Sequence, residues 1–398
     1  MTDIIIKNSK LVLADRIIEA GIAIDDGKIV DIAKDTNLPT ADKIIDARGN
    51  FVLPGLIDSH VHLREPGLVY KEDFLTGTMA AAAGGVTTVL DMPNNKPPIL
   101  TLEDLENKRK LAEKCIVDYG FHFGSSKDNL EEIKKVKNIA SVKVFMNIST
   151  GKLLIDDDSI LEEIFRSSRV ITVHAEEEKI EKAINVSKKY GNRLYLCHIT
   201  KKEWLGYLEK NKTSDIFIEV TPHHLFLSKK DDTSGLTKVY PQLESEDDQK
   251  ALWRGIEKGI VDTIGSDHAP HLLEEKKSDN PPGGVPGLET MLPLLLNAVN
   301  EKRITLRRIL ELTSQNPTKI FMIKNKGKIE VGYDADLTIV DMNLEKKVDN
   351  DKLFTKCKWS PFNGWKLKGW PVQTFVRGQL VFDNGNINKI KGKEIDYW

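Results

Sequence analysis

Short apolar runs alternate with longer amphipathic stretches through the middle of the chain. Eight such runs lie between residues 51 and 267, and they read FVLPGLID, VTTVLDM, IVDYGFHF, SVKVFM, VITVH, RLYLCH, IFIEV and VDTIGSD. The stretches between them, such as LEDLENKRKLAEK and SILEEIFRSS, carry apolar residues at intervals of three and four, which predicts amphipathic helices. Strands that alternate with helices in this way pair in parallel through helical crossovers.

Eight strand–helix units predict an α/β fold, specifically a (β/α)8 TIM-type barrel over residues 51 to 325. An open doubly wound sheet is the rival architecture, but eight units and polar residues at many strand ends favour closure. In such barrels the active site is built at the C-terminal ends of the strands. Six of the eight runs end in, or lead directly into, a histidine, lysine or aspartate.

The two flanks of the chain have a different pattern. Residues 1 to 50 are short β-type runs interrupted by DDGK, a hairpin signal, and residues 326 to 398 continue in the same style. Neither flank holds enough apolar residues to fold comfortably by itself. We therefore expect one small β-sandwich domain, assembled from residues 1–50 and 326–398 and packed beside the barrel.

The composition of the 398 residues is that of a globular protein, with 40% hydrophobic and 30% charged residues. The formal net charge is −2 and there is no basic block, which argues against nucleic-acid or anionic-membrane partners. No apolar run approaches the roughly 20 residues of a membrane span, and the acidic residues among the first thirty argue against a signal peptide. Three scattered cysteines do not form a disulfide framework, so a cytoplasmic location is expected.

Eight of the nine histidines fall in five clusters, each just after an apolar run, and only His122 lies outside them. Histidine nitrogens and carboxylate oxygens are the ligands expected for zinc. The strand ends carry five such residues, namely His60, His62, His174, His198 and Asp267. A lone histidine is more often a satisfied core residue, but five candidate ligands at four strand ends of one barrel favour a metal site.

Lys143 lies within the run SVKVFM, where strand alternation places Ser141, Lys143 and Phe145 on one face. If that face looks into the barrel, an ammonium is buried beside the metal site, which is costly unless it is neutralised. A lysine there with a depressed pKa can react with carbon dioxide to give a carbamate, an anionic oxygen ligand. The alternative is that Lys143 points between helices and reaches solvent. Spacing alone leaves both interpretations open.

The chain resembles the amidohydrolase superfamily over nearly its whole length, and within it the dihydroorotases. The motifs GLIDSHVHLREPG, DMPN, VKVFMN, HAE, LCHIT, EVTPHHLFLS, SDHAPH and PPGGVPGLETMLP occur in order, and together they are highly specific. The resemblance implies two Zn²⁺ ions, with His60, His62 and Asp267 on the first and His174 and His198 on the second. Lys143, carboxylated on its side-chain nitrogen, would bridge the two ions together with a hydroxide.

The same resemblance implies the reversible cyclisation of N-carbamoyl-L-aspartate to dihydroorotate in pyrimidine biosynthesis. The hydroxide would attack the ring amide, and Asp267 would carry its proton to the leaving nitrogen. Arg64, two residues after His62, can bind the substrate carboxylate through paired hydrogen bonds. The resemblance implies that Asn94 and His271 bind the same carboxylate. It also implies that Gly283 and Gly284 let backbone amides approach the pyrimidine ring.

Two other functions stay open. Hydantoinases and allantoinases share the metals but lack the arginine at the position of Arg64, because their substrates lack the ring carboxylate. A non-catalytic scaffold of this family would be expected to lose metal ligands, and here all six residues are present. Family members commonly form homodimers or associate with aspartate transcarbamoylase, so either partner is expected.

The chain departs from the family pattern in one segment and leaves several residues open. Tyr240 and Gln242 stand in KVYPQLESEDD where the family usually has Arg or Asn and then two prolines. That residue normally helps to hold the substrate. The loop after Lys143, with Ser149 and Thr150, is either a lid or an ordinary connection. Cys197 is expected to face away from His198 as a small core residue. His223 and His224 are interpreted as structural or as supports for the ligands.

Overall fold

The computed structural model describes residues 1 to 147, 153 to 232 and 235 to 398. Its central element is an eight-stranded parallel sheet in which strands that follow one another in the chain are neighbours. The strands are β8 (Leu56–Val61), β9 (Val86–Asp91), β10 (Asp118–Gly124), β11 (Ser141–Phe145), β12 (Val170–His174), β13 (Arg193–Leu196), β14 (Ile216–Val220) and β15 (Thr263–Ile264). Each of the eight apolar runs supplies one of these strands, which confirms the predicted barrel.

The sheet closes between its first and last strands near their C-terminal ends. Val61 of β8 forms a parallel bridge with His268, and the backbone N–H of His62 donates to the carbonyl of His268 at 2.8 Å. The Asp58 carboxylate accepts the backbone N–H of Ser266 at 3.0 Å. Closure therefore brings the residues after β15 directly beside the residues after β8.

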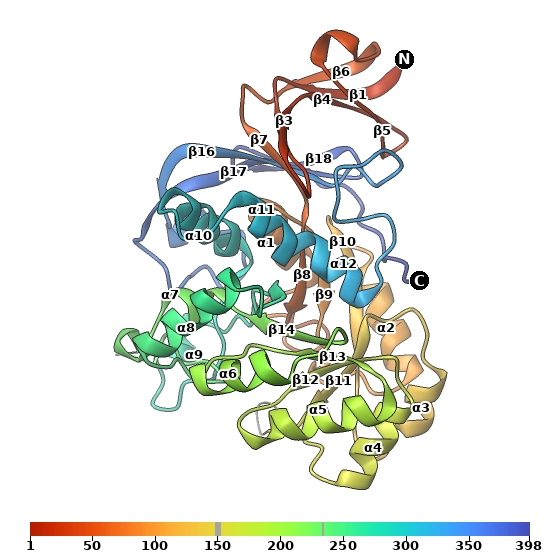
Figure 1. Ribbon diagram of the computed structural model, residues 1–398, viewed down its shortest axis with the longest axis vertical. Helices are drawn as coiled ribbons and strands as arrows, with labels where there is room; N and C mark the ends of the chain where they lie inside the picture. The colour runs from red at the N-terminus through yellow and green to blue at the C-terminus, as the bar shows by residue number, and fades with distance from the viewer. Residues whose placement is uncertain (148–152, 233–234) are drawn as a thin grey trace.

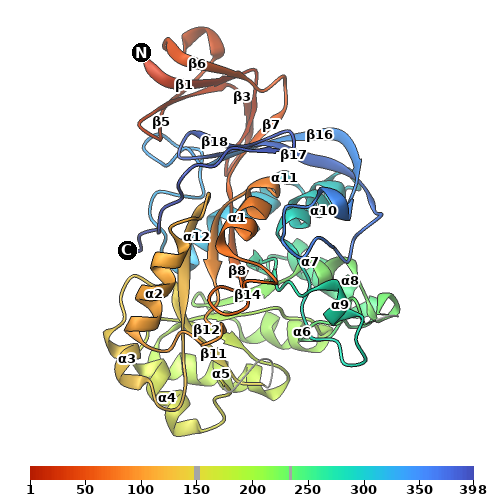
Figure 2. The same cartoon turned by 180° about the vertical axis from the view of Figure 1, so that it is seen from behind.

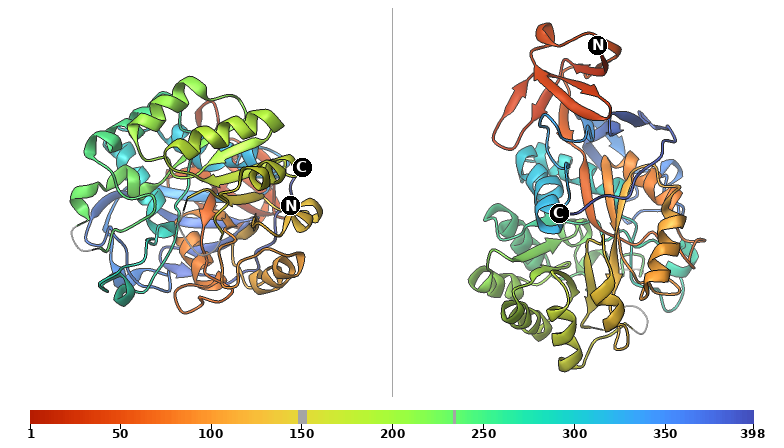
Figure 3. Two further views of the ribbon diagram at one scale, coloured as in Figure 1. Left: turned by 90° about the horizontal axis from the view of Figure 1, so that it is seen from below. Right: turned by 90° about the vertical axis from the view of Figure 1, so that its right-hand side faces the viewer.

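Helices surround the strands, as the view from below shows (Figure 3). They are α1 (Phe74–Ala83), α2 (Leu102–Ala112), α3 (Leu130–Lys135), α4 (Asp158–Arg166), α5 (Glu178–Tyr190), α6 (Lys202–Asn211), α7 (Pro222–Phe226), α8 (Glu246–Glu257), α9 (Leu273–Lys276), α10 (Leu288–Asn300), α11 (Leu306–Leu310) and α12 (Asn316–Phe321). Local sequence sets their ends: Thr101 and Ser245 form capping boxes on α2 and α8, and Gly191 ends α5 in a left-handed conformation.

A β-sandwich lies at one end of the elongated molecule, beyond the barrel (Figure 1). One sheet has the order β5-β4-β1-β6, and the other has the order β19-β18-β17-β16-β7-β2-β3. The strands are β1 (Thr2–Lys7), β2 (Lys10–Val12), β3 (Ile17–Glu19), β4 (Gly21–Asp25), β5 (Lys28–Ala33), β6 (Ala41–Asp46), β7 (Phe51–Pro54), β16 (Leu337–Lys347), β17 (Lys366–Val376), β18 (Gln379–Asp383) and β19 (Asn386–Ile387). Ile22 and Ile24 share one buried core with Leu337 and Phe375, so both chain ends contribute, as predicted.

The DDGK segment is the tight hairpin that its sequence predicts. Asp25 pairs with Lys28 across the β4–β5 turn, and the two central residues, Asp26 and Gly27, have φ values of 46° and 72°. Positive φ at both central positions is the requirement of a type I′ turn, which Asp-Gly meets at low cost.

The boundary between sandwich and barrel falls inside the first apolar run. Residues 51 to 54 form β7, which pairs with β2 and β16 of the sandwich, whereas Leu56 begins the first barrel strand. The chain crosses at Gly55, where a β-carbon would lie 2.2 Å from the Thr87 hydroxyl. A continuous apolar run hides this change of sheet, because both strands are buried.

The last residues of the chain leave the sandwich and return to the barrel (Figure 2). Glu394 forms a parallel bridge with Tyr119 of β10, and Tyr397 forms an antiparallel bridge with Ile323. Ile395 is buried in a cluster with Tyr195 and Phe321. The division of the chain at residues 50 and 325 remains a proposal, with the terminal segment as an addition to the barrel.

A buried charge cluster joins the barrel to the sandwich. The ammonium of Lys326 lies 2.7 Å from Asp118 at the start of β10, 3.2 Å from Asp334 and 2.5 Å from Asp336, just before β16. Arg377 also pairs with Asp118. Burial opposes the charge on Lys326, but Asp336 and Asp334 outweigh it and raise its pKa.

Replacing Lys326 by methionine is expected to lower the free energy of unfolding by about 3–5 kcal/mol, because it leaves buried carboxylates without their shared cation. Chemical denaturation measures this loss. Lys328→Met is the control, since its ammonium is 45% exposed and lies 3.7 Å from Glu330. Equal stability of the two variants would show that the cluster does not hold the two parts together.

Among the described residues, no helix is both long and apolar enough to cross a membrane.

Candidate active site

The residues that the sequence singles out meet in one pocket at the C-terminal ends of the barrel strands. His60 lies on β8, Lys143 on β11 and His174 at the end of β12, while His62, His198 and Asp267 follow β8, β13 and β15. The pocket is lined by His60, His62, Arg64, Asn94, Lys143, Phe145, His174, His198, Tyr240, Asp267, Ala269, Gly283 and Gly284. His271 lies directly behind Arg64.

Asp267 is the point on which the first two histidines converge. Its Oδ1 lies 3.0 Å from Nε2 of His62 and 3.3 Å from Nε2 of His60. The opposite nitrogens face acceptors: Nδ1 of His60 lies 2.8 Å from Oε1 of Glu219, and Nδ1 of His62 lies 2.7 Å from Oδ1 of Asn94. When each Nδ1 donates its proton, each Nε2 turns a lone pair toward the carboxylate oxygen. Three converging electron-pair donors could hold a cation.

The electrostatics of these residues agree with that geometry. Burial opposes a charge on His60, but Glu219 and Asp267 outweigh burial and raise the pKa of His60 well above its usual value. Burial lowers the pKa of His62 to about 4, so that ring stays neutral. The pocket thus attracts one positive charge, which either a protonated His60 or a bound cation supplies.

His174 and His198 form a second pair on the other side of Lys143. Nδ1 of His174 lies 2.9 Å from Nε2 of His198, and Nδ1 of His198 is buried with no hydrogen-bond partner in the described part of the chain. Burial is the main cause that lowers the pKa of both histidines, so both rings are neutral at pH 7. Neutral imidazoles with available lone pairs suit a divalent ion.

Lys143 points into the barrel, which decides between the two interpretations of its strand. Its side chain is 1% exposed, and Nζ lies 3.0 Å from Sγ of Cys197. Ser141, on the same face, bonds with His122 and Thr172 inside the barrel. Cys197 contacts Lys143 but does not line the pocket, and it is buried in a cluster with Ile57 and Leu90, which agrees with the expected small core residue. The strand ends at Leu196, and His198 has a φ of 37°, so strand alternation no longer applies there.

Three residues of the pocket have a backbone conformation that non-glycine residues rarely adopt. Arg64, His198 and Asp267 have φ values of 64°, 37° and 45°. Such conformations cost of order 1–3 kcal/mol and persist where the surroundings impose them, most often at functional sites. Here they place side chains from the ends of three strands, β8, β13 and β15, in the lining of one pocket.

Glu219 supports the pocket from below, and the sequence analysis missed it. It lies on β14 and is fully buried, with Oε1 accepting from His60 Nδ1 and, at 3.0 Å, from the backbone N–H of His198. Its Oε2 accepts from the hydroxyl of Tyr195 at 2.7 Å. A glutamate within the apolar run IFIEV was the available signal, because a charged residue is rarely buried without a partner.

Replacing Glu219 by glutamine is expected to weaken zinc binding by about 10- to 100-fold, because a neutral amide oxygen accepts the Nδ1 hydrogen of His60 more weakly than a carboxylate does. Competition with a chelator measures this change without any assay of activity. Glu244→Gln is the control: Glu244 is largely buried and pairs with Lys229 at 2.7 Å, and neither residue lines the pocket. Unchanged zinc affinity in Glu219→Gln would refute the supporting role.

Arg64 and His271 form the side of the pocket that faces away from the histidine pairs. Arg64 is 6% exposed; its Nε donates to the carbonyl of Pro270 at 3.0 Å, and a terminal nitrogen lies 3.1 Å from Nε2 of His271. Burial lowers the pKa of Arg64 to about 10, which leaves it charged at neutral pH. Asn94 uses its oxygen to hold His62 and lines the pocket beside Arg64.

Gly283 and Gly284 lie where larger residues do not fit. A β-carbon on Gly283 would lie 2.3 Å from the ring of Tyr240, and one on Gly284, whose φ is 132°, would lie 2.5 Å from the carbonyl of Ala269. Lys276 joins this loop to the segment before Tyr240, because its ammonium donates to the carbonyls of Lys238, Pro282 and Gly284 at 2.8, 2.9 and 3.0 Å. Tyr240 thus belongs to the wall of the pocket.

The remaining candidates lie outside the pocket or outside the described residues. His224 bonds with the hydroxyl of Thr221 and the carbonyl of Pro241, which fits the expected structural role, and His223 is buried beside it. Ser149 and Thr150 belong to residues 148 to 152, which are not described, so the lid stays a prediction.

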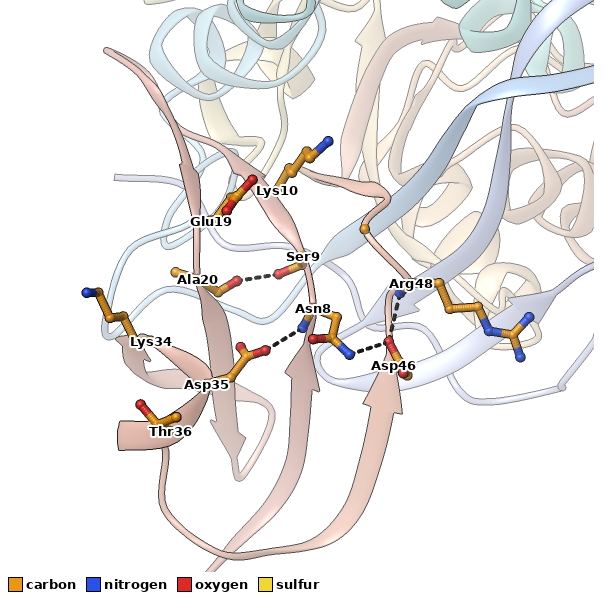
Figure 4. A pocket seen from close by; sticks show the side chains of 11 residues that line it. Asn8, Ser9, Lys10, Glu19, Ala20, Lys34, Asp35, Thr36, Asp46 and Arg48 are labelled. Carbon is orange, nitrogen blue, oxygen red and sulfur yellow. Dashed lines mark hydrogen bonds between the residues drawn. The ribbon is translucent and has the colours of Figure 1, made fainter.

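A second pocket lies in the sandwich and is lined by residues between 8 and 49 (Figure 4). Its polar groups bond to one another: Asn8 donates from its backbone to Asp35 at 2.8 Å and from its side chain to Asp46 at 2.9 Å. None of the candidate site residues lines it. The candidate chemistry therefore belongs to the barrel pocket.

A family model assigns the chain to a known group. The model described as the amidohydrolase family matches residues 51 to 381. The chain belongs to the amidohydrolase family. Amidohydrolases are metal-dependent, and this member brings donor atoms of His60, His62 and Asp267 within 4.8 Å of one another.

Several curated relatives of this amidohydrolase are named dihydroorotase. The chain is 40% identical to the dihydroorotase of Pyrococcus furiosus, over 98% of this chain and 96% of that protein. It is 38% identical to the dihydroorotase of Methanosarcina mazei, over 99% and 97%. It also matches 15% of the multifunctional protein CAD of Squalus acanthias, with 39% identity over 84% of this chain.

Several solved structures similar to this amidohydrolase are named hydantoinase. The L-hydantoinase (dihydropyrimidinase) from Arthrobacter aurescens is 32% identical, with a TM-score of 0.94 and coverage of 100% of both chains. The D-hydantoinase from Thermus sp. is 26% identical, with a TM-score of 0.89 and coverage of 99% of both chains. The fold is thus common to enzymes named for different substrates.

Proposed function

We propose that this amidohydrolase is a dihydroorotase, which reversibly closes N-carbamoyl-L-aspartate into dihydroorotate in pyrimidine biosynthesis. The observation that carries the proposal is Arg64, a buried guanidinium beside His62 at the wall of the pocket. A guanidinium binds a carboxylate through paired hydrogen bonds, and both ligands of this reaction carry a carboxylate beside the reacting amide. The dihydroorotases among the curated relatives support the same assignment.

We also propose that the pocket holds two zinc ions. His60, His62 and Asp267 would bind the first ion, and His174 and His198 the second, since each group converges within about 3.3 Å and all five residues line one pocket. Bound there, the ions would polarise the ring carbonyl and supply a hydroxide near neutral pH.

Lys143 is proposed to be carboxylated and to bridge the two ions. Its ammonium is buried, and among the described residues no carboxylate lies within 4.0 Å of it. A buried, unpaired ammonium is costly, and reaction with carbon dioxide replaces it by an anionic carbamate that metal ions neutralise. Cys197, 3.0 Å away, leaves the lysine nitrogen without a strong competing acceptor.

The residues of the chain divide the work of the reaction. Arg64, with Asn94 and His271, would hold the substrate carboxylate and so place the ring amide over the histidines. In ring opening, oxygen bonds to the amide carbon and the bond from carbon to the ring nitrogen breaks. Asp267, between His60 and His62, would carry the proton to that nitrogen, and the reverse direction returns it.

A hydantoinase is the second candidate, and one specific observation favours it. The L-hydantoinase of Arthrobacter aurescens has nearly the same fold, and Tyr240 lines the pocket where dihydroorotases usually carry Arg or Asn. The shared fold does not separate the two functions, because function depends on the residues of the site. A non-catalytic scaffold is less well supported, because all six candidate metal and catalytic residues meet in the pocket.

Partners and location belong to the same proposal. The substrate is a small molecule, and a homodimer or an association with aspartate transcarbamoylase is proposed for the assembly. A cytoplasmic location is proposed because Cys115, Cys197 and Cys357 are all unpaired and buried, as suits a reducing compartment.

The deciding experiment is the turnover of dihydroorotate, N-carbamoyl-L-aspartate, hydantoin and allantoin by the zinc-loaded protein. Activity on the first two alone is the expected result. Activity on hydantoin or allantoin with none on dihydroorotate would transfer the assignment to the second candidate. Bound zinc without turnover of any of the four would favour the scaffold.

A further inference from the structure

Lys71 lies in the loop between β8 and α1 and contacts His271, the residue that lies against Arg64. Its ammonium lies 2.9 Å from Nδ1 of His271 and 2.9 Å from Oε1 of Glu275, and the side chain is only 8% exposed. Neither the resemblance nor the strand-end pattern singles out this lysine, which is 200 positions away from His271 in the chain.

The contacts of His271 determine where its ring carries a proton. An ammonium has protons to donate and no lone pair to accept, so Nδ1 beside Lys71 is the unprotonated nitrogen. Nε2 lies 3.1 Å from the carbonyl of Gly283, which can only accept, so Nε2 carries the hydrogen. Burial and the nearby Arg64 and Lys71 lower the pKa of His271 to about 2, which keeps the ring neutral.

With the hydrogen of the ring on Nε2, the terminal nitrogen of Arg64 lies beside a protonated nitrogen. That nitrogen lies 3.1 Å from Nε2 of His271, and neither atom offers the other a lone pair. The hydrogen on Nε2 is already donated to the carbonyl of Gly283, so the ring accepts no hydrogen bond from Arg64. The terminal nitrogen of Arg64 therefore keeps its N–H groups for another acceptor, and a guanidinium with such groups matches the two oxygens of a carboxylate.

We propose that Lys71 is a positioning residue for the substrate carboxylate: it fixes His271 in the Nε2–H form, so that the ring accepts no hydrogen bond from Arg64 and the guanidinium keeps its donors for the carboxylate. The role rests on the proposed function, because it presumes a substrate with a carboxylate at this position. Glu275 holds the ammonium in place from the other side, through the contact at 2.9 Å. Lys71 itself acts through His271 and does not contact the substrate.

The first test is independent of any substrate. Nitrogen-15 spectra of the histidine-labelled, substrate-free protein distinguish the two ring forms, and His271→Asn identifies the signals of His271. The expected spectrum of the wild-type protein shows Nε2 protonated and Nδ1 unprotonated, and Lys71→Met is expected to remove this preference. A wild-type ring protonated on Nδ1, or a spectrum unchanged in Lys71→Met, would overturn the proposal.

The second test is kinetic. Lys71→Met is expected to raise KM for dihydroorotate roughly tenfold, the effect of losing about one hydrogen bond, while kcat changes less than twofold. Lys71→Arg, which keeps donors near Nδ1, is expected to restore most of the affinity. Lys212→Met is the matched control: Lys212 is also paired with a carboxylate, that of Asp262 at 2.7 Å, but it lies before β14 at the opposite end of the strands.

An equal rise of KM in Lys212→Met, or a fall of kcat without a change of KM in Lys71→Met, would contradict the positioning role. Failure of the wild-type protein to turn over dihydroorotate would instead refute the proposed function. The labelled-histidine spectrum then still supports or overturns the effect of Lys71 on the ring.

Discussion

Replacing Arg64 by methionine is expected to lower kcat/KM for dihydroorotate by about 10³-fold, because it removes the charged partner of a buried carboxylate. The guanidinium is 6% exposed, so little water can replace it in the variant. Its backbone φ of 64° and its bond to the carbonyl of Pro270 hold it against His271 before substrate arrives. Steady-state rates in both directions of the reaction measure the effect.

The controls for Arg64 separate carboxylate binding from general damage. Arg308→Met removes another arginine with backbone partners, the carbonyls of Ile256 and Val261, at a position outside the pocket. It is expected to leave kcat/KM unchanged. Zinc content should also be equal in wild type and Arg64→Met. If Arg64→Met kept its activity on dihydroorotate, the observation that carries the proposed function would be lost.

Replacing Lys143 by methionine is expected to lower kcat by about 10³-fold or more and to reduce bound zinc, because the shared anionic ligand of the two ions is lost. Lys143 is 1% exposed and lines the pocket together with His174 and Phe145, with its nitrogen 3.0 Å from Sγ of Cys197. Elemental analysis measures the zinc. Carbon-13 spectra of protein prepared with labelled bicarbonate should show a carbamate in the wild type that is missing in the variant.

The stability of Lys143→Met provides the internal control. Methionine fills nearly the same volume and removes a buried charge, so the melting temperature of the metal-free protein should stay equal or rise. A lower melting temperature would mean that the activity was lost through misfolding. Full activity and full zinc content in the variant would contradict the bridging role.

The barrel strands and the DDGK hairpin could be predicted from the local pattern of apolar and polar residues. Each of the eight apolar runs became a barrel strand, and the DDGK segment became a hairpin whose central residues have positive φ. Both results depend on periodicity and on turn chemistry, which act over a few neighbouring residues. The position of histidines after strands also located the pocket, because parallel strands bring their C-terminal ends to one edge.

Several features of the site depended on contacts that no local pattern contains. The direction of Lys143 was undecided in the sequence, because either face of a barrel strand is buried. The contact of Cys197 with Lys143 joins residues 54 positions apart, so the run RLYLCH alone could not show it. The change of sheet at Gly55 was hidden inside a single apolar run.

The sequence by itself determined the barrel, the shared sandwich, the edge that carries the chemistry and the residues that gather there. Only the tertiary structure decided that Glu219 holds His60, that Lys276 joins the two segments of the wall and that Lys71 contacts His271. These contacts join residues 159, 38 and 200 positions apart. Periodicity reports which face of its own strand or helix a residue occupies, whereas the partner of a buried charge is set by how distant segments pack.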